Sequence, residues 1–411
     1  MLSELFPRGY PRYASLPVLG ECLDGFVVWL RGQGYPLLPI RLRIRATPRL
    51  DDLLRRCGVR RPSEISSAAL LRCVPTDSQN DHYLGAVVRS LVRYLDERGV
   101  FLLPPTTPAG MLVASYRAYL QMARGLSAPT VAHHSRTVAE FIAFLDYDHH
   151  PDRLRQLDQA KVEDFLLVLR TRLARASLQH SVAHLRSFLR FLAGQALVRP
   201  GLDSQLDAPR LYRGERLPRA LSWETVRALL SAIDRSTPTG RRNYAMLLLV
   251  ATYGLRSSEV VALTLEDVEW RAARLRVQRP KVSAPLLLPL TPEVGGALLD
   301  YLRHGRPELP YREIFLRVRA PAGTLKRTAL WGAFQRSVRS SGLSVPFQGS
   351  HCLRHSLAVH LLRQGTPLKT IGDLLGHRSA ESTCVYLRLH IEDLRDVALQ
   401  LPAEARAEVR R

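Results

Sequence analysis

Four short segments between residues 252 and 390 carry side chains that could act together on a phosphate group. Arginine forks bind phosphodiester oxygens through paired hydrogen bonds, while lysine, histidine and tyrosine can move protons or attack phosphorus. The segments are TYGLRSSEV with Arg256, VQRPKVSAPLLLPL with Lys281, HCLRH with His351 and Arg354, and LLGHRSAESTCVY with His377 and Tyr386. The set contains neither a carboxylate pair nor a metal-binding triad, so it indicates phosphoryl transfer to a side chain.

Transfer of a phosphodiester to the hydroxyl of Tyr386 would use each of these side chains. Negative charge builds up on the non-bridging oxygens in the transition state, where preorganised cationic donors stabilise it. A phenol with an ordinary pKa of about 10 needs help to lose its proton, and a histidine can accept or orient that proton. The leaving 5′ oxygen needs a proton, which lysine can supply and arginine effectively cannot. Only four of the 59 basic residues are lysine, so proton chemistry explains Lys281 better than chance does.

Each of these residues also has an ordinary structural explanation. A lone arginine near a helix start is usually a surface charge, and a lone tyrosine between apolar neighbours is usually a core residue. The complete, ordered set favours the chemical interpretation. We interpret His355 and His360 as structural, and the pairs His133–His134 and His149–His150 have no supporting ligands placed around them for a metal.

Local spacing predicts the elements that hold the set. Arg256 stands at the start of a predicted helix, where unpaired N–H groups suit an anion. His351 and Arg354 are three residues apart, which puts them on one face of a helix. Ser379 is a candidate N-cap for the helix that carries Tyr386.

A hairpin and further helices complete this region. Strand-like runs at 274–277 and 284–290 predict a β-hairpin with Lys281 in its turn. Ser222 is expected to cap a helix over LSWETVRALLSAI, with Glu224 in its first turn. Seven more helices are expected in this region. They are predicted over 243–253, 257–263, 293–302, 325–340, 354–364, 368–375 and 380–389.

The whole chain is predicted to contain three units and a tail: 1–105, 108–200, 217–390 and 391–411. Residues 108–200 carry helical apolar spacing near 111–123, 128–145, 158–174 and 178–197, which predicts a small helical bundle. Prolines and glycines interrupt 198–220, which predicts a linker. In the first unit, alternating arginines in Arg41–Arg49 predict an extended segment, either a phosphate-contacting arm or a solvated edge.

Composition narrows the class of partner. The 411 residues carry a formal net charge of +22 and a pI near 10.6, which favours nucleic acid, although acidic membranes and ribosomes also attract basic proteins. Five cysteines without a C-x-x-C motif fit a reducing compartment. With no signal-peptide core and no apolar run of about 20 residues, the expected location is cytoplasmic.

In order and spacing, the four segments resemble the motifs of the tyrosine recombinase family, the phage-integrase-like site-specific recombinases. GLRSSEV resembles the first arginine box, HCLRH resembles the H-x-x-R-H box, and LLGHRS with its following tyrosine resembles the last box. Lys281 matches the mobile hairpin lysine, eight residues before Pro289. The resemblance implies that the catalytic residues are Arg256, Lys281, His351, Arg354, His377 and the nucleophile Tyr386, with Glu259 in support.

The resemblance also implies a fold and an activity. The fold would be mainly α with a small β-sheet: a helical core-binding (SAM-like) domain at 108–200, an α/β catalytic domain at 217–390, and an extra N-terminal domain that binds arm sites or partner proteins. The enzyme would be an integrase or transposase of a mobile element. It would act on double-stranded DNA through a 3′-phosphotyrosine and a Holliday junction, without a cofactor.

A homotetramer on DNA is expected from the same resemblance, with partner recombinases or accessory factors as an open question. The amphipathic tail at 391–411 would dock on a neighbouring protomer, or else pack on its own domain. Two rival functions remain: a type IB topoisomerase that works as a monomer, and a non-catalytic DNA-binding regulator on a recombinase fold.

Overall fold

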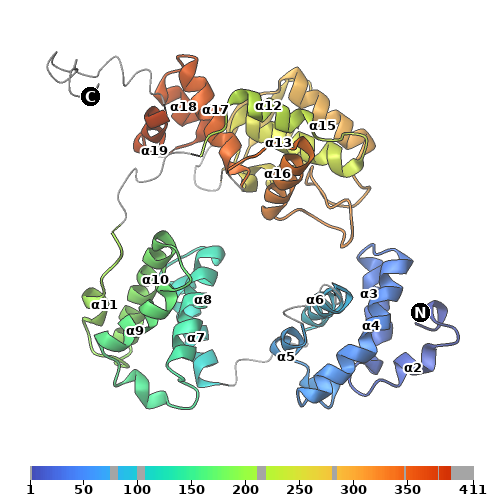
Figure 1. The fold of residues 1–411 in the computed structure, drawn as a ribbon, viewed down its shortest axis with the longest axis vertical. Helices are drawn as coiled ribbons and strands as arrows, with labels where there is room; N and C mark the ends of the chain where they lie inside the picture. The colour runs from blue at the N-terminus through green and yellow to red at the C-terminus, as the bar shows by residue number, and fades with distance from the viewer. Residues whose placement is uncertain are drawn as a thin grey trace, which may run out of the picture. The chain divides into compact units, whose positions relative to one another are not determined.

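Helices make up most of the chain (Figure 1). The computed structural model describes residues 2–74, 82–99, 107–210, 219–279, 285–346, 349–377 and 379–389, so Lys281 and the tail 391–411 lie outside the described residues. Contacts group Met1–Pro62, Ser78–Val87 and Arg216–Arg411 into one unit, and Ser63–Asp77 with Val88–Glu215 into another. The domain boundaries predicted from the sequence stay predictions.

The first four helices pack on one another around a buried carboxylate. Asp51 is fully buried and accepts hydrogen bonds from the backbone N–H groups of Val18 (3.0 Å) and Leu19 (2.9 Å), which precede α3. These bonds satisfy N–H groups that a helix start leaves without partners. The helices of the first hundred residues are α1 (Leu2–Leu5), α2 (Tyr10–Ala14), α3 (Gly20–Gly32), α4 (Leu37–Arg56), η1 (Pro62–Glu64), α5 (Ser67–Arg72) and α6 (His82–Glu97).

The extended segment predicted at Arg41–Arg49 is wrong, because all of it lies within helix α4. Ile40, Ile44 and Leu54 on this helix are fully buried. Their helical spacing decides the local structure, since buried apolar contacts outweigh a two-residue alternation of charged side chains. The arginines of this segment therefore project from a helix and not from an extended arm or edge.

The four helices predicted between residues 108 and 200 are confirmed, and they share one core. Its centre is aromatic: the ring of Tyr116 lies edge-on to Phe188 with centroids 5.0 Å apart, and both side chains are fully buried. The elements are α7 (Pro108–Ala118), the π-helix η2 (Tyr119–Ala123), α8 (Ala128–Phe144), η3 (Pro151–Leu154), α9 (Gln159–Arg170), α10 (Arg175–Gly194) and α11 (Leu202–Gln205).

The first part of the predicted linker is not a linker. Val198, Leu202 and Leu206 are buried in the core of this helical bundle, and α11 packs against α10. The prolines and glycines that suggested a linker flank a short helix whose apolar side chains still need to be buried.

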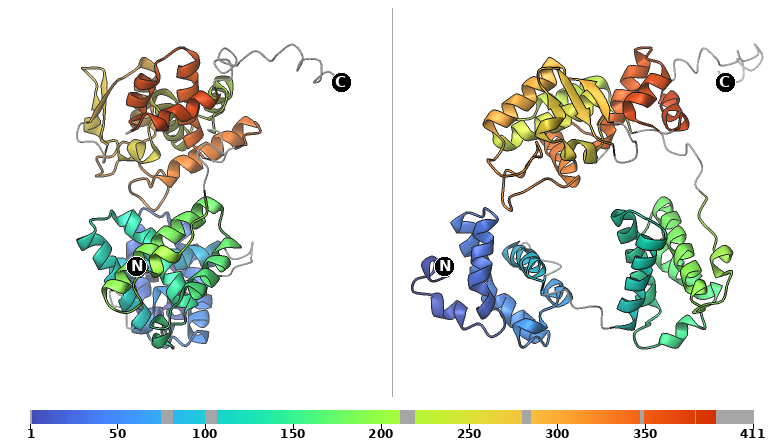
Figure 2. Two further views of the ribbon diagram at one scale, coloured as in Figure 1. Left: turned by 90° about the vertical axis from the view of Figure 1, so that its left-hand side faces the viewer. Right: turned by 180° about the vertical axis from the view of Figure 1, so that it is seen from behind.

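The C-terminal half builds a second core from helices and a small sheet (Figure 2). The sheet has the order β1-β2-β3 with antiparallel pairs, and Leu275 of β2 pairs with Leu288 of β3. This confirms the predicted hairpin strands and the mainly helical fold class. Ser222 caps α12 by accepting a hydrogen bond from the N–H of Thr225 (3.2 Å), also as predicted.

The elements of this half are α12 (Trp223–Ser231), α13 (Pro238–Tyr253), α14 (Ser257–Ala262), η4 (Leu265–Asp267), β1 (Val268–Glu269), β2 (Arg274–Val277), β3 (Leu286–Pro289), α15 (Pro292–His304), α16 (Thr328–Ser341), α17 (His351–Arg363), α18 (Leu368–Leu375), α19 (Glu381–Cys384) and the 3₁₀ helix η5 (Val385–Leu389). Among the described residues, no helix combines the length and apolar character needed to cross a membrane.

Candidate active site

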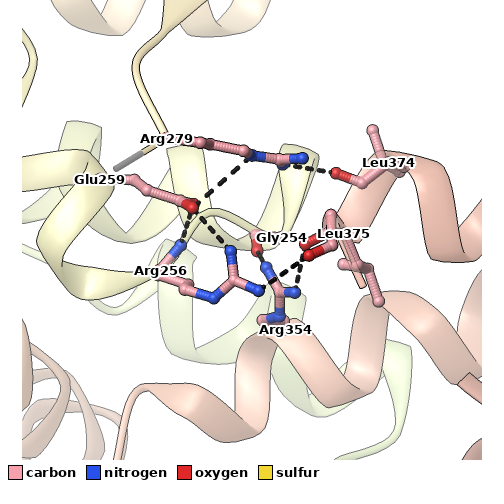
Figure 3. Close-up of polar contacts among 8 residues, drawn as sticks. Gly254, Arg256, Glu259, Arg279, Arg354, Leu374 and Leu375 are labelled. Carbon is pink, nitrogen blue, oxygen red and sulfur yellow. Dashed lines mark hydrogen bonds and ion pairs between the residues drawn. The ribbon is translucent and has the colours of Figure 1, made fainter. Parts of the chain in front are cut away.

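Three arginines bind three consecutive carbonyl groups at the C-terminal end of α18 (Figure 3). The last carbonyls of a helix have no partner within the helix, and they carry the negative end of its dipole. The pairs are Arg279 Nη2 to Leu374 O (2.8 Å), Arg354 Nη2 to Leu375 O, and Arg256 Nη2 to Gly376 O (3.1 Å). The helix end thus holds three cationic side chains together before any anion is bound.

Glu259 ties two of these arginines to each other (Figure 3). Its carboxylate accepts hydrogen bonds from the backbone N–H (2.8 Å) and Nη1 (2.8 Å) of Arg256, and it lies 3.6 Å from Nε of Arg279. The carboxylate side chain is 3% exposed, whereas that of Arg256 is 40% exposed. Glu259 therefore fixes the Arg256 guanidinium through Nη1 while leaving the side chain accessible to an anion.

Arg354 lies deeper and is 2% exposed. Its Nη1 donates to the carbonyl oxygen of Gly254, at the residue that ends α13 in a left-handed conformation with φ of 64°. Burial, followed by the charge of Arg256, lowers the pKa of Arg354 to about 10, so the side chain stays charged at neutral pH.

Three histidines, His351, His355 and His377, lie near the arginines, and burial lowers the pKa of each of them. His351 is the first residue of α17, and its ring lies edge-on to that of His355 with centroids 4.8 Å apart. Loss of hydration, followed by the charges of Arg354 and Arg256, lowers the pKa of His351 and lowers that of His377 to about 4. His377 Nδ1 is hydrogen-bonded to the hydroxyl of Thr383 (2.8 Å), which fixes the orientation of its ring.

Tyr386 is 1% exposed and lies in η5. Its hydroxyl is 3.0 Å from Nδ1 of His355, and its ring is stacked on that of His377 with centroids 6.2 Å apart. Burial raises the pKa of Tyr386, and the arginine charges oppose this rise.

The prediction that Ser379 is the N-cap is wrong. Helix α19 starts one residue later than expected, so its N-cap is Ala380, which makes no side-chain hydrogen bond to the helix.

Six of the seven residues predicted from the sequence lie together in this site: Arg256, Glu259, His351, Arg354, His377 and Tyr386. Lys281 lies outside the described residues. Within the described part of the chain, no group of three His, Cys, Asp or Glu side chains could hold a metal ion.

Two residues of the site were not selected from the sequence. The signal that could have pointed to Arg279 is its place in the sequence, just after strand β2 and two residues before Lys281. His355 was interpreted as structural, although its spacing of four from His351 already placed both on one helical face. His360, in contrast, stacks on Trp223 with centroids 4.2 Å apart, as a structural residue would.

Comparisons with known proteins agree with this geometry. Residues 219–392 match the model of the phage integrase family, and residues 113–196 match the SAM-like N-terminal domain of phage integrases. The chain is 34% identical to the putative integrase/recombinase y4rA of Sinorhizobium fredii over 92% of this chain and 94% of that protein. It is 29% identical to the tyrosine recombinase XerD of Listeria monocytogenes over 72% of this chain and 99% of that protein.

A solved structure shares the fold. The XerH site-specific recombinase, bound to a palindromic difH substrate after cleavage, matches with a TM-score of 0.56 at 16% identity, over 80% of this chain and 93% of that one. The family match, the relatives and the fold give the same answer: the chain belongs to the phage integrase family of tyrosine recombinases.

Proposed function

We propose that this recombinase cleaves and rejoins double-stranded DNA at specific sites, as the integrase or transposase of a mobile element, with Tyr386 as nucleophile. The observation that carries the proposal is the position of the Tyr386 hydroxyl. It is hydrogen-bonded to a neutral histidine next to Arg354, one of the three arginines held at the end of α18. A buried tyrosine that served only the core would not need this concentration of positive charge around it.

Arg256 and Arg354 would bind the non-bridging oxygens of the scissile phosphate, assisted by His351 and His377. Their attachment to fixed carbonyl groups means that little reorganisation is needed as charge develops in the transition state. Attack by the tyrosine oxygen on phosphorus would form a 3′-phosphotyrosine. In this proposal Lys281 protonates the leaving 5′ oxygen. The covalent bond conserves the energy of the broken phosphodiester, so the reverse step needs neither ATP nor a cofactor.

The proposed partner is duplex DNA, which the net charge of +22 favours through release of counterions. The structural relative XerH is described as bound to its difH substrate. We further propose that four protomers hold two DNA sites, exchange strands through a Holliday junction, and dock residues 391–411 on one another. The reaction would take place in the cytoplasm, and accessory proteins or partner recombinases could join it.

The two rival functions make different demands on the site. A non-catalytic DNA-binding regulator has no need of a tyrosine hydroxyl oriented by a histidine, so the geometry around Tyr386 favours the enzyme. A type IB topoisomerase would use the same chemistry as a monomer on arbitrary DNA. Plasmid relaxation without a specific site would favour that enzyme over a recombinase.

A covalent-trapping experiment tests the proposal. Full-length protein is mixed with nicked duplexes that span the ends of the DNA element encoding it, and the products are separated on denaturing gels. We expect a protein–DNA band with wild type and none with Tyr386→Phe, which removes only the nucleophilic oxygen. Tight, sequence-specific binding without any covalent band would instead support the regulator.

A further inference from the structure

The hydroxyl of Tyr386 has a specific partner in His355, the last residue of HCLRH, which the sequence suggested to be structural. His355 Nδ1 lies 3.0 Å from the oxygen, while Nδ1 of the other nearby histidine, His377, is bonded to Thr383. His355 also lies next to Arg354 in the chain and on the same helix, α17. The side chain that could handle the tyrosine proton is therefore built into the helix that carries a proposed phosphate-binding arginine.

The surroundings of His355 determine its protonation state. The groups that face it are His351 and Arg354 on α17, His377 after α18, and Arg219 before α12. Burial first, and then these neighbours, lower the pKa of His355 to about 4. At neutral pH the ring is thus uncharged, so one of its two nitrogens carries a free lone pair and can accept a proton. In the tautomer with the proton on Nε2, Nδ1 accepts from the hydroxyl of Tyr386, and the tyrosine oxygen keeps lone pairs available for phosphorus.

We propose that His355 is a further catalytic residue: its Nδ1 orients the hydroxyl of Tyr386 and accepts the hydroxyl proton as the tyrosine oxygen attacks phosphorus. This inference rests on the proposed recombinase function and deepens it.

In the cleavage step the O–H bond of Tyr386 breaks and its proton moves to His355 Nδ1. The bond between the tyrosine oxygen and phosphorus forms, and the bond between phosphorus and the 5′ oxygen breaks. The 5′ oxygen takes a proton from the proposed acid, Lys281. When the 5′ hydroxyl attacks in the reverse step, its proton returns to Lys281 and the bond between phosphorus and the tyrosine oxygen breaks. The tyrosine oxygen recovers its proton from the imidazolium of His355, so the enzyme returns to its starting state.

The bound substrate makes His355 a stronger base. In the free protein, burial and then the neighbouring charges, those of Arg354 and Arg219 among them, lower its pKa. A phosphodiester brings negative charge to the same arginines, and an opposite charge within about 4–6 Å favours the protonated form of a histidine. Proton acceptance is thereby linked to the presence of the scissile phosphate.

A measurement on the protein alone tests the hydrogen bond. Tyr386 is replaced by 3-fluorotyrosine, and its ¹⁹F resonance is compared in wild type, His355→Leu and His360→Leu. His360 is the matched control, since it lies on the same helix and contacts Trp223. We expect His355→Leu to shift the resonance and His360→Leu to leave it in place. An unshifted resonance in His355→Leu would overturn the proposal, with or without a known DNA site.

A rate measurement tests the proton transfer. Covalent complex formation on the nicked duplexes is followed from pH 7 to pH 9.5. His355→Leu is expected to lose about 100-fold or more at pH 7, the usual contribution of a general base. The deficit should shrink at higher pH, because the phenolate fraction rises tenfold per pH unit below the tyrosine pKa. His355→Asn keeps an acceptor near the Nδ1 position that can orient the hydroxyl but cannot take its proton, so it should show a deficit at pH 7 that also shrinks at higher pH.

The two proposals fail in different ways. If wild type forms covalent complex and His355→Leu forms it equally fast, or with a deficit that is constant from pH 7 to pH 9.5, the role of His355 is wrong. If wild type forms no covalent complex on any duplex, the proposed function fails instead, and the ¹⁹F measurement still decides whether His355 holds Tyr386. Melting temperature and duplex binding of each variant check that the fold is intact.

Discussion

Gly376 is the position where the geometry of the arginine cluster can be tested most directly. It ends α18 with φ of 63°, and a Cβ placed there would lie 2.2 Å from Nη1 of Arg279. Gly342 ends α16 with almost the same φ, 65°, but a Cβ there meets nothing within 4 Å. Comparing Gly376→Ala with Gly342→Ala therefore separates the free-energy cost of a left-handed alanine from the cost of displacing Arg279.

The magnitudes follow from these contacts. A left-handed conformation costs a non-glycine residue roughly 1–2 kcal/mol, so Gly342→Ala should lower the free energy of unfolding by about that amount. In Gly376→Ala the Arg279 guanidinium must also move, losing its hydrogen bond to Leu374 O. A hydrogen bond to a charged group is worth about 1.5–3 kcal/mol, which brings the expected total to roughly 2.5–5 kcal/mol.

Urea denaturation followed by circular dichroism gives the comparison. The loss of unfolding free energy in Gly376→Ala beyond that in Gly342→Ala should largely disappear when Gly376→Ala is made in an Arg279→Met background and compared with Arg279→Met alone. Methionine has no guanidinium at the site of the clash. If Gly376→Ala and Gly342→Ala cost the same within about 0.5 kcal/mol, Arg279 is not held against the end of α18, and the three-carbonyl arrangement is wrong.

Two further predictions concern protons. Lys281→Met should cleave ordinary DNA about 100-fold more slowly than wild type, or worse. On a duplex whose leaving 5′ oxygen is replaced by sulfur, the variant should recover to near the wild-type rate, because a thiolate departs without a proton. Equal slowness on both duplexes would show that Lys281 is not the acid. Burial lowers the pKa of His184 in the helical bundle from 6.5 to about 4. Between these two pH values the unfolded chain binds a proton at His184 that the folded protein does not, so the free energy of unfolding should fall as the pH drops from 6.5 toward 4. The fall in melting temperature between pH 7.5 and pH 5 should be smaller in His184→Asn than in wild type, and an equal fall would contradict this.

Much of the site could be predicted because its parts are local in sequence. The Arg256–Glu259 ion pair spans three residues in the first turn of α14, and the spacing of His351 and Arg354 on one helical face required only the period of a helix. The hairpin strands follow from short apolar runs on either side of a turn.

The carbonyl framework could not be predicted, because carbonyl groups have no side-chain signature. The bonds of Arg279 and Arg256 to the end of α18 join residues 95 and 120 positions apart. Only the packing of α13, α17 and α18 brings these groups together. The role of His355 also depends on which way two side chains turn, which spacing alone does not determine. The prediction at Arg41–Arg49 failed for a different reason. It followed a short alternation of charged residues, whereas the apolar residues at helical spacing in α4 determine the structure.

The exposure of the site residues sets an order of events. The side chain of Arg256 is 40% exposed, whereas Arg354 and Tyr386 are 2% and 1% exposed. A DNA phosphate can therefore meet Arg256 first, but it cannot reach the tyrosine oxygen while η5 is packed as described. Burial also raises the pKa of Tyr386, so the enclosed hydroxyl stays protonated and is a poor nucleophile. Cleavage thus requires the site to open around the Tyr386 hydroxyl while its hydrogen bond to His355 is kept, so DNA binding and tyrosine activation become two separable steps of one reaction.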